Sequence, residues 1–269
     1  MRVGPDRLLR VLLEPALTGA VNMHRDAELL SSHTLTTPVT LRLYTWLRPT
    51  VSVGYMQEPE ALLDLDACRS AGVDVVRRPT GGRAVLHWEE ITYAVVASAR
   101  DPRFGNGVAG AYEVIGACLA AALSRLGIET QLSRPERDPG RLRLRQPCFA
   151  SAGRAELLAA GRKLVGSAQR RTAGAFLQHG SLLVGPAHLG LVELLRDARR
   201  DADFAAALRD RLTRETTTLR ALLGRDPPFA ELAAALVAGF SARLRLVAVV
   251  DAAGPGAAPA AESRPATAQ

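Results

Sequence analysis

The sequence predicts an α+β (mixed α/β) fold with one core. The chain has 269 residues, 48% of them hydrophobic, which is enough to bury a core without disulfides or a metal. Segments with the composition of strands come in runs joined by short turns, and the helical segments are grouped between these runs. This grouping is typical of antiparallel strands with packed helices, and it argues against a doubly wound parallel sheet.

Strands and two helices are expected in the N-terminal part of the chain. A helix is predicted at 22–31 from its apolar spacing, and another from Pro59 to about Ser70, where Gly72 ends it. The predicted strands are 7–14, 39–46, 51–55, 73–78, 83–87 and 91–98.

Residues 108–127 form the clearest predicted helix, because apolar residues recur at helical spacing and Gly127 is a C-terminal cap signal. One domain is expected over 7–250, followed at 251–269 by a disordered tail rich in Ala and Pro. The other expected elements are a surface loop at 133–146, short strands over 147–184, helical pieces over 187–243 with breaks at Thr216–Thr218 and Pro227–Pro228, and a strand at 244–250.

The charge balance indicates acidic partners. Lys and Arg total 34 against 27 Asp and Glu, a net charge of +7, and a positive surface attracts acidic molecules. The charge alone fits an acidic protein as well as it fits nucleic acid, but only 4% of residues are aromatic and no nucleic-acid-binding motif occurs, so no nucleic-acid partner is expected. No apolar run has the length of a membrane span, and the N-terminus lacks a signal-peptide core, so we expect a cytoplasmic protein without membrane contact.

Metal and nucleotide chemistry are not predicted. The three cysteines and five histidines form neither a CxxC nor an HExxH motif, and no cofactor is expected. Gly105–Gly110 matches GxGxxG, but the preceding strand is predicted to end near Ser98, whereas a phosphate-binding turn follows its strand directly. A loop before a helix is therefore favoured over a nicotinamide site.

The segment 77–85 joins two predicted strands through Gly81 and Gly82. Two glycines permit positive φ angles and the close approach of a ligand, and the flanking arginines can bind an anionic group. A tight hairpin with solvated arginines explains the same residues, so both interpretations stay open.

Cys148 is a candidate nucleophile, because it lies where the basic loop meets a predicted strand and a thiol there can be exposed. Cys68 and Cys118 lie in predicted helices and are expected to be inert. Lys163 is the only lysine among the 34 cationic residues, which makes it a candidate for proton transfer that arginine cannot perform. An ammonium near a thiol favours the thiolate, and it can exchange a proton with an incoming amine.

Several motifs, taken together in chain order, resemble the biotin/lipoate protein ligase superfamily. Within it they are most similar to the cysteine-dependent octanoyltransferases of the LipM type, and the likeness covers roughly residues 7–250. The motifs are NMHRDAELL (22–30), PTVSVGYMQ (49–57), RRPTGGRAVLH (77–87), CFAS (148–151), GRKLVGSAQRR (161–171) and LQHGSLLV (177–184).

The resemblance implies one catalytic domain with a central, largely antiparallel sheet flanked by helices. It also implies transfer of octanoyl from acyl carrier protein to a lysine of a lipoyl domain, such as the glycine cleavage H protein or a dehydrogenase E2 subunit. Cys148 and Lys163 fall on the family's acyl-thioester cysteine and its lysine. The expected substrate-binding residues are Arg78, Thr80, Gly81, Gly82, Arg83, Ala84, Val85, His87, Gly166, Ser167, Ala168, Gln169, Gln178, His179 and Gly180.

Three alternative functions remain open. An ATP-dependent lipoate–protein ligase needs no cysteine; Cys148 argues against it, as does Arg83, where such ligases usually carry a third glycine. An amidotransferase that moves octanoyl between lipoyl domains shares the Cys/Lys pair. A non-catalytic acyl- or lipoyl-domain-binding protein would keep the fold without the reaction.

Overall fold

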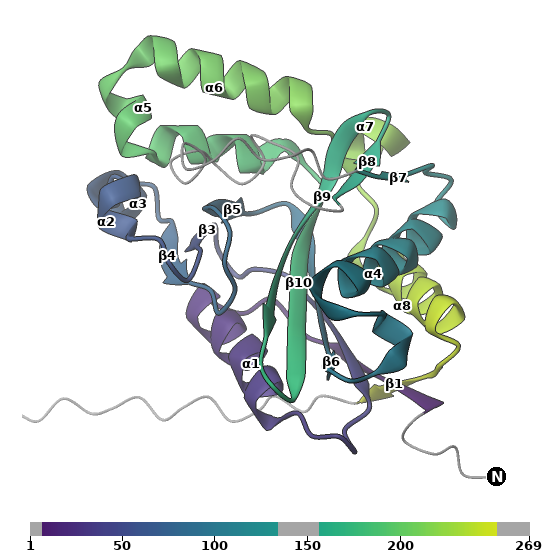
Figure 1. Ribbon diagram of the computed structural model, residues 1–269. Helices are drawn as coiled ribbons and strands as arrows, with labels where there is room; N and C mark the ends of the chain where they lie inside the picture. The colour runs from purple at the N-terminus through teal and green to yellow at the C-terminus, as the bar shows by residue number, and fades with distance from the viewer. Residues whose placement is uncertain (1–6, 134–155, 252–269) are drawn as a thin grey trace, which may run out of the picture.

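Two β-sheets and the helices packed on them form the fold of the computed structural model, which describes residues 7–133 and 156–251 (Figure 1). In the larger sheet β1 runs parallel to both of its neighbours, and the other neighbouring strands run antiparallel. The prediction of a largely antiparallel central sheet is confirmed. Its strands are, in order, β11 (Val247–Asp251), β1 (Leu8–Leu13), β2 (Val39–Tyr44), β6 (Glu90–Ser98), β10 (Ala175–Leu183), β9 (Arg162–Arg171), β8 (Leu157–Ala159) and β7 (Gln131–Leu132).

The smaller sheet corrects the hairpin interpretation of the glycine-rich turn. Its central strand is β3 (Thr50–Val53), which pairs in parallel with β4 (Asp74–Arg77) and antiparallel with β5 (Val85–His87). The strands on either side of the turn therefore do not pair with each other. Instead the turn crosses from one edge of the sheet to the other.

Helices cover both faces of the large sheet (Figure 1). On one face α4 (Gly107–Ser124) and α8 (Phe229–Leu244) share a core with the inward residues of the central strands. On the other face α1 (Gly19–Ser32) packs Met23 and Leu30 against β2, β6 and β10. The small sheet lies on that same side, with a separate core shared with the last residue of β10.

One predicted helix is two helices. The chain forms α2 (Pro59–Leu62) and α3 (Leu65–Ser70), and the single helix expected from Pro59 to Ser70 is wrong. The break occurs at Asp64, whose side chain caps α3 by accepting from the Ala67 amide and whose own amide donates to Leu194 O at 2.9 Å. A contact with a segment far along the chain thus ends the first helix.

The C-terminal helical pieces follow the prediction. The breaks at Thr216–Thr218 and at Pro227–Pro228 are confirmed, and Thr218 caps the helix that follows it. A 3-10 helix, η2 (Pro102–Phe104), separates β6 from Gly105, as expected for a loop rather than a phosphate-binding turn. The remaining pieces are η5 (Pro186–Leu194), α5 (Arg196–Arg200), α6 (Ala202–Glu215) and α7 (Leu219–Leu223).

Helix α4 is the one helix in the described part of the chain that is long and apolar enough to cross a membrane, which corrects the expectation that no segment is. Its buried side packs against the sheet and α8. At the crossing, a Cβ on Gly239 would lie 2.7 Å from Cys118 O. Packing in the core therefore accounts for its composition.

Candidate functional site

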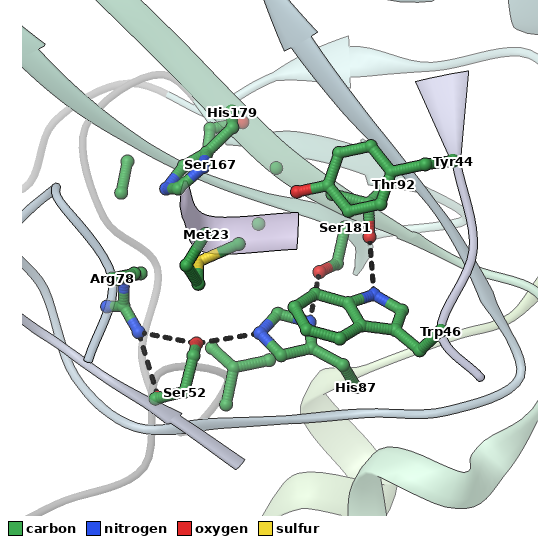
Figure 2. A pocket seen from close by; sticks show the side chains of 14 residues that line it. Met23, Tyr44, Trp46, Ser52, Arg78, His87, Thr92, Ser167, His179 and Ser181 are labelled. Carbon is green, nitrogen blue, oxygen red and sulfur yellow. Dashed lines mark hydrogen bonds between the residues drawn. The ribbon is translucent and has the colours of Figure 1, made fainter. Parts of the chain in front are cut away.

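A pocket lies between the two sheets (Figure 2). One wall comes from β9 and β10, the other from β3, β5 and the residue after β4, and α1 and β2 contribute further side chains. The lining residues are Met23, Tyr44, Trp46, Ser52, Arg78, Val85, His87, Thr92, Gly166, Ser167, Ala168, His179, Gly180 and Ser181.

His87 lies on the small-sheet wall within a chain of polar groups (Figure 2). Its Nδ1 is 2.9 Å from Glu90 Oε1 and its Nε2 is 2.7 Å from Ser52 Oγ. The indole of Trp46 stacks on the imidazole with ring centroids 4.1 Å apart. Burial alone would raise the pKa of Glu90, but His87 and the hydrogen bonds from Thr92 and His87 hold it below its usual value. Because an ionised carboxylate can only accept, Nδ1 of His87 donates.

His179 faces the pocket from the large sheet and has partners of the same kind. Its Nδ1 is 2.7 Å from Asp26 Oδ2, on α1, and its Nε2 is 2.6 Å from Thr80 Oγ1, in the glycine-rich turn. Burial alone would raise the pKa of Asp26, but the hydrogen bond from His179 and the charge of Arg42 lower it. His179 thus connects α1, the large sheet and the turn.

An ion cluster around Arg42 supports the part of the pocket wall that carries His179. Arg42 is fully buried, and its guanidinium bonds Asp26 Oδ1 at 2.7 Å and Glu14 Oε2 at 2.8 Å. Burial and the Asp26 charge raise the pKa of Tyr44 well above its usual value, so its hydroxyl stays protonated and donates to Asp26. The carboxylate that holds His179 is therefore itself fixed by several donors.

Arg78 orders the glycine-rich turn and is not a solvated arginine. It is only 4% exposed, and its guanidinium donates to Ser52 Oγ at 3.0 Å and to the carbonyls of Gly81 and Arg83 at 2.8 and 2.7 Å. The turn also packs closely on β3, because a Cβ on Gly54 would lie 2.0 Å from Gly82 O. These contacts fix the turn against the small sheet.

Of the predicted substrate-binding residues, the structure brings eight to the pocket wall: Arg78, Val85, His87, Gly166, Ser167, Ala168, His179 and Gly180. The other seven do not line it. Thr80 reaches it through His179, while Gly81, Gly82, Arg83 and Ala84 lie elsewhere in the turn, before β5. Gln169 donates to Gln178, and Gln178 donates to the hydroxyl of Tyr93, whose ring contacts Phe240 on the α8 side of the sheet.

Lys163 is turned toward the pocket side of the large sheet by a β-bulge. Leu157 pairs with Val165 and Leu158 with Lys163, so β9 carries one extra residue, Leu164. Leu164 and Val165 both enter the core under α4 and α8, and a bulge of this kind re-aims the next side chain. Lys163 does not line the pocket; its ammonium lies 2.5 Å from Glu156 Oε1.

The predicted nucleophile Cys148 lies outside the described residues, as do most of the basic loop and the tail from residue 252. The two described cysteines are buried. Burial raises the pKa of the Cys118 thiol to about 12 and also raises that of Cys68, so neither forms a thiolate at neutral pH. Within residues 7–133 and 156–251 no group of His, Cys, Asp and Glu side chains could hold a metal ion.

Sequence reasoning did not select the acidic partners of the two histidines. One signal for Asp26 was available, because it is spaced from Met23 and Leu30 so as to share the apolar face of α1, where an acid needs a partner. Glu90, Ser52 and the aromatic wall gave no such signal. The pocket residues outside the predicted set are Met23, Tyr44, Trp46, Ser52, Thr92 and Ser181.

Comparison with known proteins gives concordant results. The lipoyl protein ligase A/B catalytic domain matches residues 18–241. Octanoyltransferase LipM of Kyrpidia tusciae is 39% identical over 236 residues, 84% of each chain, and that of Symbiobacterium thermophilum is 40% identical over 85% of this chain and 83% of the relative. A bipartite lipoate protein ligase solved with its E2 lipoyl domain, from Thermoplasma acidophilum, has the same fold, with a TM-score of 0.74 at 23% identity over 90% of this chain and 86% of that chain.

Proposed function

Because this chain belongs to the lipoyl protein ligase A/B catalytic domain family, we propose that it is an octanoyltransferase of the LipM type acting on lipoyl-domain proteins. The observation that carries the proposal is the identity near 40% with octanoyltransferases over 84% or more of the chain. The octanoyl donor is acyl carrier protein, and the reaction takes place in the cytoplasm. The net charge of +7 supports acidic protein partners.

The reaction has two steps through Cys148. In the first, the Cys148 thiolate attacks the thioester carbonyl of the donor, a new C–S bond forms, the donor's own C–S bond breaks, and the departing donor thiolate takes a proton from the Lys163 ammonium. In the second, the ε-amine of the lipoyl-domain lysine attacks that carbonyl, an amide forms, and the proton lost by the amine passes to the departing thiolate. Lys163 favours the thiolate in the first step and relays the proton in the second. An amide is more stable than a thioester, so no ATP is consumed.

The pocket between the sheets takes the acyl chain. Met23, Val85 and the small residues Gly166 and Ala168 leave apolar surface along its walls. Each buried CH₂ stabilises the complex by about 0.8 kcal/mol, so an eight-carbon chain gains several kcal/mol. One methylene more or less is then discriminated by only about 10–200-fold.

The test is an assay with octanoyl-acyl carrier protein and an apo lipoyl domain, without ATP. We expect the lipoyl domain to gain the mass of one octanoyl group. Modification only with free lipoate and ATP would instead identify a ligase, and transfer only from a second octanoylated lipoyl domain would identify an amidotransferase. If the lipoyl domain is not modified under any of these conditions, the remaining function is that of a non-catalytic binding protein.

A further inference from the structure

We propose that Glu156 is the positioning residue of Lys163, holding its ammonium on the pocket side of the large sheet and balancing its charge during acyl transfer. This inference rests on the proposed function, because it concerns the lysine that relays the proton. Glu156 directly precedes β8, whose strand partner β9 carries Lys163 (Figure 1).

The contact is short and removed from solvent. Lys163 Nζ lies 2.5 Å from Glu156 Oε1, and the two side chains are 3% and 6% exposed. A buried ammonium without a counter-charge is strongly unfavourable, so this carboxylate is what allows a charged lysine at the position. A lysine stem is also flexible, and an ion pair restricts where its end group lies.

Other described neighbours of Lys163 are backbone groups and a histidine. The backbones of Thr216 and Lys163 form an isolated parallel β-bridge, and Thr217 N donates to Lys163 O at 2.9 Å. His188, from η5, interacts electrostatically with Lys163, but burial lowers its pKa to about 4, so it is neutral at working pH. Among the described residues, Glu156 is therefore the acidic side chain in contact with the lysine.

The second oxygen of Glu156 supports a role in the reaction. Oε2 is buried and has no hydrogen-bond partner among the described residues. A buried carboxylate oxygen without a hydrogen bond is unfavourable, so its presence in an ion pair calls for an explanation. Oε2 offers the Lys163 amino group a second hydrogen-bond acceptor while this group loses and regains its proton in the two steps.

The backbone contacts of Glu156 separate its structural role from the role of its carboxylate. Glu156 N donates to Ser133 Oγ at 2.9 Å, and Ser133 N donates to Glu156 O at 2.8 Å. Replacing the carboxylate by an amide leaves both bonds in place. Ser133→Ala removes one of them without touching the carboxylate, which makes it the matched control.

The test measures the two half-reactions separately in wild type, Glu156→Gln, Glu156→Asp and Ser133→Ala. We expect Glu156→Gln to slow both thioester formation and transfer to the lipoyl domain by about 10–100-fold, with little change in KM and with a displaced pH–rate profile. Glu156→Asp keeps a carboxylate and recovers part of the rate, while Ser133→Ala matches wild type in rate and pH profile.

Wild-type rates and an unchanged pH profile in Glu156→Gln would overturn the proposal. If that variant does not fold, wild-type behaviour of Glu156→Asp, whose carboxylate is drawn back by one methylene, would overturn it. A Ser133→Ala variant as slow as Glu156→Gln would also overturn it, because the effect would then be structural. Failure of the wild-type enzyme to form a thioester would instead refute the proposed function.

Discussion

His87 and His179 face one pocket from opposite walls, each with a carboxylate at Nδ1 and a hydroxyl at Nε2. Buried polar groups are tolerated when they are hydrogen-bonded, so these partners explain how two imidazoles line a largely apolar pocket. They also fix the ring orientations. The polar residues of the wall are therefore set by side chains behind it, Asp26 and Glu90.

Arg42 provides a test of this buried support. Arg42→Met removes the arginine from the buried Asp26 and leaves Glu14 with Arg25 alone, so we expect the free energy of unfolding to fall by about 3–5 kcal/mol. Arg10→Met is the control, because the Arg10–Asp251 pair is about 40% exposed and should contribute no more than about 1 kcal/mol. Urea unfolding measures both, and equal small losses in the two variants would contradict the account.

His188 predicts a pH dependence of stability. Burial lowers its pKa to about 4 from the usual value of about 6.5, so as pH falls the unfolded chain binds the proton first. The free energy of unfolding should decrease between about pH 6.5 and pH 4, by up to about 3 kcal/mol from this residue. His188→Gln removes that part of the slope in urea unfolding at several pH values. The exposed His24, changed to Gln, is the control, and an unchanged slope in His188→Gln would show the assignment to be wrong.

At the scale of elements, the β-bulge in β9 determines on which face of the large sheet the Lys163 side chain lies. Without the extra residue Leu164, regular alternation would direct Lys163 into the apolar core with Val165. A period-two pattern in the sequence could not reveal this, because Lys163, Leu164 and Val165 are all buried. The strand was predicted, but the face was not.

Helices α4 and α8 cross at Gly239. An alanine in a helix is usually about 1 kcal/mol more stable than glycine, but a Cβ here would lie 2.7 Å from Ala122 N and Cys118 O. We expect Gly239→Ala to lower the free energy of unfolding by about 1–3 kcal/mol. Gly174→Ala, with nothing within 4 Å of its Cβ, is the control. A stabilised Gly239→Ala variant in thermal or urea unfolding would disprove the close crossing.

Across the whole molecule, local signals predicted the elements, whereas long-range contacts set the site. Proline, glycine and periodicity lie in the sequence where they act, which explains the correct breaks at Thr216–Thr218 and Pro227–Pro228. The hydrogen bond from His179 to Asp26 joins residues 153 positions apart, and the split at Asp64 depends on Leu194. No local pattern contains such pairs, so the two-sheet pocket was predicted only in part.

The net charge of +7 makes a prediction about the encounter with the donor. If the donor is an acidic carrier protein, raising the ionic strength from about 0.01 M to 1 M shortens the Debye length from about 30 Å to 3 Å and should slow thioester formation. An uncharged small octanoyl thioester should react at a rate that does not depend on salt. Stopped-flow or quench measurements compare the two, and equal salt dependence would argue against electrostatic docking.

The most direct test of the central claim is intact-protein mass spectrometry of wild type and Cys148→Ser after mixing with octanoyl-acyl carrier protein. Wild type should gain one octanoyl group that hydroxylamine removes and that an apo lipoyl domain accepts. Cys148→Ser should gain no hydroxylamine-labile group. An adduct of equal amount in both proteins, or transfer to the lipoyl domain without Cys148, would contradict the thioester mechanism.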